Sequence, residues 1–95
     1  MKNGNIQEFI DKLHYGEEIV FTYKSRKYFI QGWYSKKDSI ATMVLDDVTE
    51  LKEHDYIWKY SANTMRECAD VFLASPLWDG KDFLQIQENI TWSYW

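Results

Sequence analysis

The residues of this chain that could do chemistry are one cysteine, Cys68, two histidines, His14 and His54, and a run of carboxylates over 46–55. A nucleophilic cysteine needs a cation or a helix end beside it to favour the thiolate. Cys68 instead belongs to an apolar helical series that includes Phe72, and Arg66 lies about 200° around the helix axis from it. The sequence therefore predicts a buried structural cysteine.

Metal binding is not indicated by the remaining polar residues. His14 falls at the end of a predicted first helix, where a partly charged imidazole complements the helix dipole. His54 lies between two acids that favour its protonated form, and a zinc site would need further ligands at suitable positions. The acids lack the spacing and the glycine of a calcium-binding EF-hand loop; they are Asp46, Asp47, Glu50, Glu53 and Asp55. We expect a solvated acidic surface, with no metal and no cofactor, that could steer a basic partner.

Catalytic motifs do not appear either. The four glycines are isolated, so there is no phosphate-binding loop, and neither a Gly-x-Ser-x-Gly elbow nor a His-Glu-x-x-His pair is present. We therefore expect a protein that is not an enzyme. A small hydrolase or metal protein would be recognised only by polar groups that converge in a cleft.

Composition indicates one globular domain over residues 1–95. The chain is 45% hydrophobic and 27% charged, which excludes disorder, and no apolar run approaches the roughly 20 residues of a membrane span. The N-terminus lacks the apolar core of a secretory signal, and a single cysteine fits a reducing cytoplasm. A net charge of −4 does not favour nucleic-acid binding.

The elements that must position these residues begin with a β-hairpin over 18–34. An even loop, Ser25-Arg26 or Lys24–Lys27, places Tyr23 opposite Tyr28 and gathers an uncharged apolar face; that face is Ile19, Phe21, Tyr23, Tyr28 and Ile30. In a meander, the acidic segment after the third strand returns to the tip of this hairpin, where it could neutralise Lys24–Lys27.

The second face of the hairpin is also partly apolar, and it poses the functional question. It carries Val20, Phe29 and Trp33, whereas a solvated sheet face usually alternates more cleanly with polar residues. Either later strands cover these side chains, or they are simply exposed, or they form a surface for a protein partner or a second copy. We expect the partner-binding residues to be Val20, Phe29, Trp33 and Trp58, with Asp46, Asp47 and Glu50 as steering charges.

The whole pattern predicts an α+β fold with a four-stranded antiparallel meander, in the order α-β-β-β-β-α-α. Asn5–Leu13 is expected as a helix capped by Asn5, and Thr64 and Glu67 form a capping box for a second helix. Strands are expected at 18–24, 28–34, 39–45 and 55–60, and a last helix over 81–89 capped by Asp79. The tail 90–95 could be a short strand or an apolar strap.

One resemblance follows from the motif Leu77-Trp78-Asp79-Gly80-Lys81-Asp82-Phe83, with Ile86 and Ile90-x-Trp92 after it. This stretch resembles the C-terminal part of short proteins of low-GC Gram-positive bacteria and their mobile elements. The resemblance implies no activity and no site residue, and it favours an accessory role over core metabolism.

Two classes of function remain at this point. The first is a non-enzymatic protein–protein interaction module of the regulator, inhibitor or immunity type, docking through the second sheet face. The alternative is a nucleic-acid-related role, either an acidic mimic that uses 46–55 in place of phosphates or a single-strand binder that uses Lys27, Phe29 and Trp33.

Overall fold

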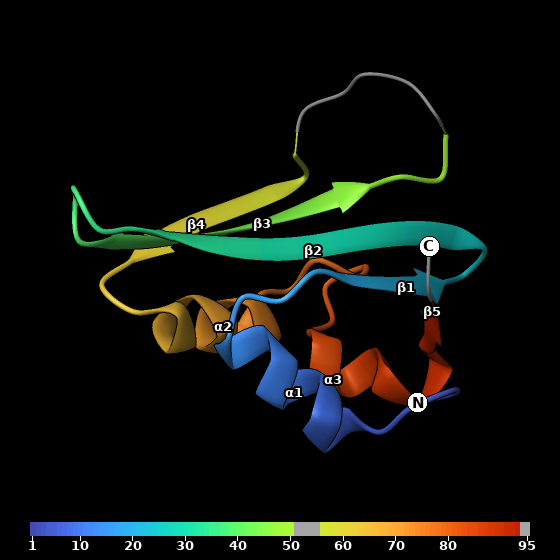
Figure 1. The fold of residues 1–95 in the computed structure, drawn as a ribbon. Helices are drawn as coiled ribbons and strands as arrows, with labels where there is room; N and C mark the ends of the chain where they lie inside the picture. Colours follow the sequence, from blue (N-terminus) through green and yellow to red (C-terminus); the bar gives the residue numbers. More distant parts are fainter. Residues whose placement is uncertain (51–55, 94–95) are drawn as a thin grey trace.

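A computed structural model describes residues 1–50 and 56–93 of the chain (Figure 1). The described elements follow the order α-β-β-β-β-α-α-β. Their bounds are α1 Ile6–His14, β1 Ile19–Tyr23, β2 Arg26–Ser35, β3 Ile40–Asp47, β4 Trp58–Ala62, α2 Met65–Ala74, α3 Phe83–Ile86, the 3-10 helix Gln87–Asn89 and β5 Thr91–Ser93.

In the part of the chain that the structure describes, the sheet has five strands in the order β4-β3-β2-β1-β5, so the four-strand prediction was wrong. The tail supplies the extra strand, because Thr91–Ser93 pairs antiparallel with β1. Residues near the N-terminus then cover the outer edge of β5: the amide of Trp92 donates to the carbonyl of Lys2 at 2.9 Å. Such cover shields a sheet edge that would otherwise present unpaired backbone groups.

The β1–β2 hairpin has the predicted faces but not the predicted register. Tyr23 lies opposite Arg26 and Ile19 opposite Ile30, a shift of two residues from the expected pairing. The turn is the pair Lys24-Ser25, whose φ angles of 49° and 65° are both positive, as a type I′ turn requires. Because the shift is even, the apolar residues of the first face stay together.

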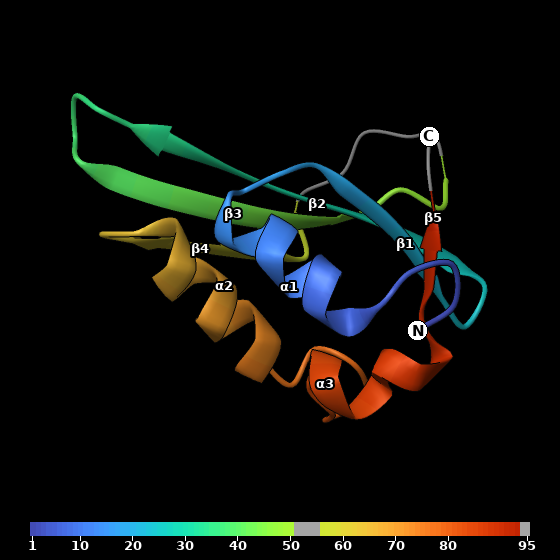
Figure 2. The same ribbon diagram turned by 60° about the horizontal axis from the view of Figure 1, so that its bottom comes forward.

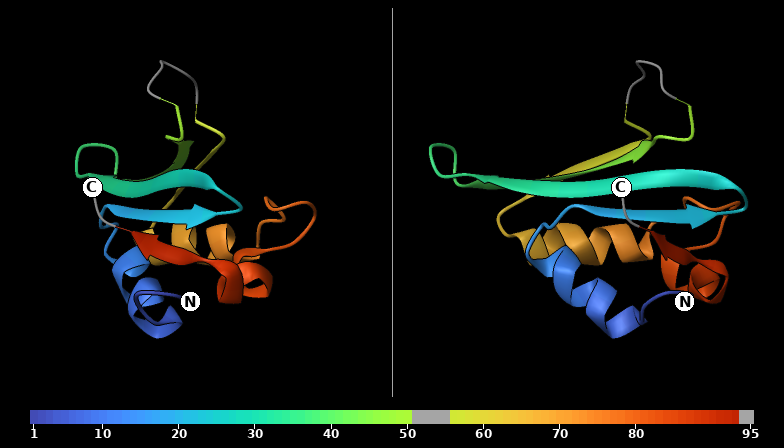
Figure 3. Two further views of the ribbon diagram at one scale, coloured as in Figure 1. Left: turned by 90° about the vertical axis from the view of Figure 1, so that its right-hand side faces the viewer. Right: turned by 45° about the vertical axis from the view of Figure 1, so that its right-hand side comes forward.

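All the helices cover one face of the sheet (Figures 2 and 3). The core lies between these two layers and includes Phe9, Phe21, Phe72 and Phe83, none of which is exposed. Their rings meet at centroid distances between 4.7 and 5.8 Å. Aromatic packing of this kind supplies much of the burial in a chain of this size.

The connection between α1 and β1 lies close to the backbone of β2 at Gly32. The amide of Gly32 donates to the carbonyl of Gly16 at 3.1 Å. A Cβ atom on Gly32 would lie 2.5 Å from the Met65 sulfur and 3.2 Å from the Cα of Gly16, so the close backbone approach favours glycine at this point of the strand. This contact explains a glycine in the interior of a strand.

The predicted helix starts are confirmed for α1 and α2 and wrong for α3. The side chains of Asn5 and Thr64 accept from the amides of Glu8 and Glu67. The Glu67 carboxylate accepts from the Thr64 hydroxyl at 3.2 Å, in place of the backbone bond of a full capping box. The last helix is shorter than predicted, and its cap is Asp82 with a full capping box to Gln85.

Within the described residues, no helix combines the length and apolar character that a membrane crossing would need.

Candidate functional site

The face of the sheet opposite the helices, called here the helix-free face, is the candidate site. Strand pairing assigns its members, because directly opposed residues share a face. From β1 to β4 they include Val20, Thr22, Lys27, Phe29, Gln31, Trp33, Ile40, Thr42, Val44, Asp46, Lys59 and Ser61. Two pairs of hydroxyl groups are hydrogen-bonded to each other across neighbouring strands of this face. The hydroxyls of Thr42 and Ser61 lie 2.8 Å apart, and those of Thr22 and Ser93 lie 3.3 Å apart.

The exposed apolar part of this face lies toward the β2–β3 turn. Trp33 is 44% exposed and Ile40 is 40% exposed. Trp33 pairs with Thr42, and Ile40 is two residues before Thr42 on the same strand, so the two side chains are diagonal neighbours. We call Trp33 and Ile40 the distal patch. It lies on a hairpin that extends past the helix layer at the left of Figure 1.

The expected apolar anchors on this face differ in how much of each side chain is exposed. Trp33 is accessible and Phe29 is half-buried, but Val20 is only 3% exposed and cannot contribute contact area directly. Ile40 was missed because the predicted third strand was considered only for its extent. Pairing the predicted second and third strands across their turn would have placed Ile40 on the same face as Trp33.

Trp58 does not belong to this face. It lies opposite Leu45, on the side that the helices cover. Its ring packs against Phe72 of α2 at 5.5 Å, and it is partly buried against the core. Trp58 therefore packs against the helix layer and does not share a face with Trp33.

The predicted steering acids are split between the two faces. Asp46 lies opposite Phe29 on the helix-free face, whereas Asp47 lies opposite Tyr28 on the helix side. An Asp47 carboxylate oxygen accepts from Nε of Arg26 at 2.6 Å. Glu50 is exposed beyond the end of β3. Asp46 is thus separated from Asp47 by the sheet, and Asp47 is engaged in the ion pair with Arg26.

The neutralisation of the hairpin tip by the acidic segment is confirmed at Arg26. Hydrogen bonding to Asp47 is the main cause that raises the pKa of Arg26. Burial tends to raise the pKa of Asp47, but bonds from Arg26 and Thr49 outweigh it and hold that pKa below its ordinary value. The amide of Lys27 also donates to the Thr49 hydroxyl at 2.8 Å. At this end of the sheet, polar groups of the β1–β2 hairpin are thus paired with groups at the end of β3 and just beyond it.

Cys68 is buried, as its place in the apolar series predicted. Its Sγ lies 3.5 Å from the carbonyl oxygen of Ala41 and 3.7 Å from that of Tyr60, to which it can donate. Burial raises the pKa of the thiol, which disfavours the reactive thiolate. The geometry supports a structural role and offers no nucleophile.

The histidines and acids also bring no metal site together in the described residues, where no group of three potential ligands occurs. His14 lies in the last turn of α1, as predicted, beside a shallow surface pocket that it shares with Asp11, Tyr15 and Arg66. His54, Glu53 and Asp55 lie outside the described residues.

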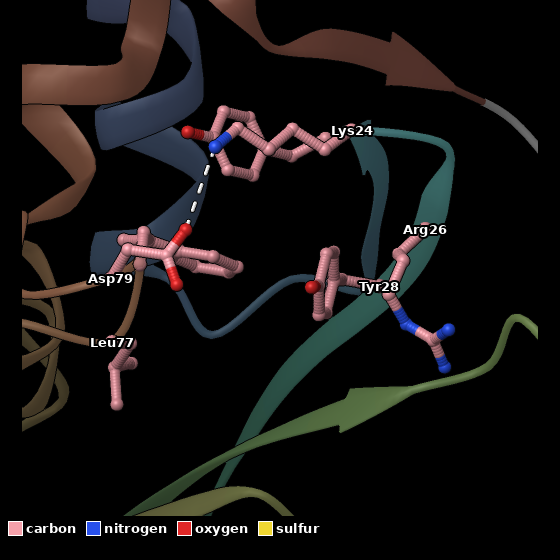
Figure 4. A pocket seen from close by; sticks show the side chains of 7 residues that line it. Lys24, Arg26, Tyr28, Leu77 and Asp79 are labelled. Carbon is pink, nitrogen blue, oxygen red and sulfur yellow. Dashed lines mark hydrogen bonds and ion pairs between the residues drawn. The ribbon is translucent and has the colours of Figure 1, made fainter.

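A second pocket, of about 200 Å³, lies between two tight turns (Figure 4). Lys24 on one turn reaches a carboxylate oxygen of Asp79 on the other at 3.5 Å, and both side chains are mostly exposed. The floor is aromatic, with Trp78 meeting Tyr28 edge to face at 4.9 Å. Trp78 is the residue that sequence reasoning missed here, although the resemblance motif contains it.

The chemistry of this pocket is limited by its charges. Lys24 is balanced by Asp79, and Arg26 points away from Lys24 and Asp79 toward β3, where it binds Asp47. The Trp78 indole nitrogen is buried and has no hydrogen-bond partner among the described residues. Among the described residues that line the pocket there is no serine, cysteine or histidine to pair with these charges as a nucleophile or base.

Comparison with known proteins adds no relative: no family model, curated protein or solved structure matches this chain.

Proposed function

We propose that this protein is a non-enzymatic interaction module that binds another protein through its helix-free face, with Trp33 as the central anchor. The observation that supports the proposal is the exposure of Trp33 beside Ile40 on the sheet face opposite the described helices. Tryptophan is enriched at binding hot spots, because a large ring gains much from losing water. Two adjacent apolar side chains on a projecting hairpin give a partner a compact point of attachment.

Because the core lies between the sheet and the helix layer, a partner can bind the helix-free face without disturbing core packing. The core is complete on the other side, where Phe9, Phe21 and Phe83 are fully buried. Val44, near the centre of the helix-free face, is also fully buried, so this apolar side chain is not exposed to water in the free protein. Docking would therefore add contacts at Trp33 and Ile40 and leave the core unchanged. A regulator, inhibitor or immunity-type role in the cytoplasm fits such a module.

A photo-crosslinking amino acid at position 33 tests the proposal in native extract. We expect one discrete adduct, competed by the unlabelled protein and not by a Trp33→Ala competitor. The matched control carries the same amino acid at position 84, since Leu84 is 49% exposed but belongs to α3 in the helix layer. Equal adducts from both positions, or no discrete adduct from position 33, would contradict the proposal.

A further inference from the structure

We infer that the partner presents an acidic surface around the groups that contact the distal patch, the opposite of the basic partner expected from the sequence. This inference rests on the proposed function and specifies its partner. It follows from where the structure places the charges relative to Trp33 and Ile40. The described steering acids, Asp46, Asp47 and Glu50, lie toward the other end of β2 and β3, whereas lysines lie near the patch.

The turn that joins β2 to β3 carries Lys36 and Lys37, both exposed. Neither forms an ion pair with any residue that the structure describes. The one acid in this turn, Asp38, has a local role: its carboxylate accepts from the Ser35 hydroxyl at 3.2 Å. Lys59 of β4 adds a further exposed cation on the same face. Lys36, Lys37 and Lys59 outnumber Asp38, which keeps its charge beside the neutral Ser35 hydroxyl, so the net charge around the distal patch is positive.

The acids responsible for the net charge of −4 are concentrated elsewhere. Exposed carboxylates of the helix layer are Glu8 and Asp11 of α1, Glu67 and Asp70 of α2, and Glu88 of the 3-10 helix. These helices also carry Lys12 and Arg66, so the helix layer is negative by an excess of acids, whereas the turn end of the helix-free face has an excess of cations. Such an arrangement orients an approaching acidic surface toward the patch and turns a basic one away.

Two other occupants fit these charges less well. A symmetric pair of copies joined patch to patch, with the two-fold axis passing beside Trp33 and Ile40, would bring the nearby Lys36 and Lys37 close to the same lysines of the second copy. A single nucleic-acid strand following β2 from Trp33 to Phe29 would pass Asp46, which lies opposite Phe29 on the same face. An aliphatic side chain, Ile40, also offers no stacking surface for a base. An acidic protein partner that docks on Trp33 and Ile40 alone is attracted by the lysines and does not have to extend to Asp46.

The test is selection of a random twelve-residue peptide library on the full chain, with depletion on the Trp33→Ala variant. We expect the selected peptides to combine Asp or Glu with apolar residues. Their affinity should fall about tenfold or more when Lys36→Glu and Lys37→Glu are combined, because two attractions become repulsions. The matched control combines Arg66→Glu and Lys81→Glu, which changes the net charge equally on the helix side and should leave the affinity within about twofold.

The outcomes separate this inference from the proposed function. Neutral or basic peptides that still depend on Trp33, or equal losses in the two double variants, would overturn the acidic partner and leave docking intact. If no peptide depends on Trp33, docking itself fails. A labelled random single-stranded DNA of twelve nucleotides is titrated in parallel, and binding to it that is lost in Trp33→Ala would overturn a protein partner in favour of nucleic acid.

Discussion

The tryptophans of this chain show how one residue type takes opposite roles according to its position. Trp92 is buried on the helix side, where its ring meets Phe9 at 5.5 Å, and Trp58 packs on Phe72. Trp33 lies on the helix-free face and keeps 44% of its surface exposed. Its neighbours on β2, Gly32 and Tyr34, point to the helix side, so a single step along the strand separates a packing position from a binding position.

Replacing Trp33 and Trp92 by alanine separately should distinguish these roles. Trp92→Ala removes a buried ring and should lower the free energy of unfolding by about 3–5 kcal/mol. Trp33→Ala removes a half-exposed ring and should cost less than about 1 kcal/mol. Urea unfolding of each variant, followed by circular dichroism, measures both values. A loss of similar size in the two variants would place Trp33 in the core.

At the scale of elements, two tight turns control the ends of the strands and the position of Trp78. The Lys24-Ser25 turn and the Asp79-Gly80 turn both use two positive φ angles. In the second turn the residues suit the conformation, and the amide of Lys81 donates to the carbonyl of Trp78 at 3.0 Å. This use of Asp79 in a turn explains why it cannot cap α3. In the first turn, lysine and serine adopt a left-handed conformation that glycine and asparagine adopt more readily.

The Lys24-Ser25 turn should therefore gain stability from Asn-Gly. Lys24→Asn with Ser25→Gly should raise the free energy of unfolding by about 1 kcal/mol, because the left-handed strain is relieved. The Lys24→Gln variant is the control, since it also removes the exposed ion pair with Asp79. Thermal unfolding measures all three proteins. If the double variant is no more stable than Lys24→Gln, strain in this turn is not a cost to the fold.

At the scale of the whole molecule, the two ends of the described chain hold the second edge of the sheet. Lys2 accepts from the amide of Trp92, and its own amide donates to the carbonyl of Ile90 at 2.8 Å. Gly4 lies against the Trp92 ring so closely that a Cβ there would be 2.3 Å from a ring carbon. The N-terminal segment and β5 thus depend on each other, far from the distal patch.

Gly4→Ala should loosen this junction without affecting the binding face. The added methyl group overpacks against the Trp92 ring and should cost about 1–3 kcal/mol. Hydrogen exchange should show faster exchange of the Trp92 amide, while the amides paired between β2 and β3 lose protection only to the extent that global stability falls. Unchanged protection at Trp92 would mean that the N-terminal segment moves aside freely.

The sequence by itself determined the local features. Periodicity and capping residues predicted α1, α2 and the faces of the β1–β2 hairpin, because these depend on neighbours within a few residues. Burial of Cys68 and the contact of the acidic segment with Arg26 could also be predicted, the first from helical spacing and the second from the reversal of direction in a meander.

Only the tertiary structure decided the fifth strand, the place of Trp58 and the division of Asp46 from Asp47. Each depends on pairing between segments distant in sequence: β5 joins β1 across about seventy residues, as Val20 opposite Ser93 shows. Register then fixes which side chains share a face, and a one-residue difference exchanges the faces. For the same reason, the side of the sheet left without helices, and hence the exposure of Trp33 and Ile40, could not be obtained from residue order alone.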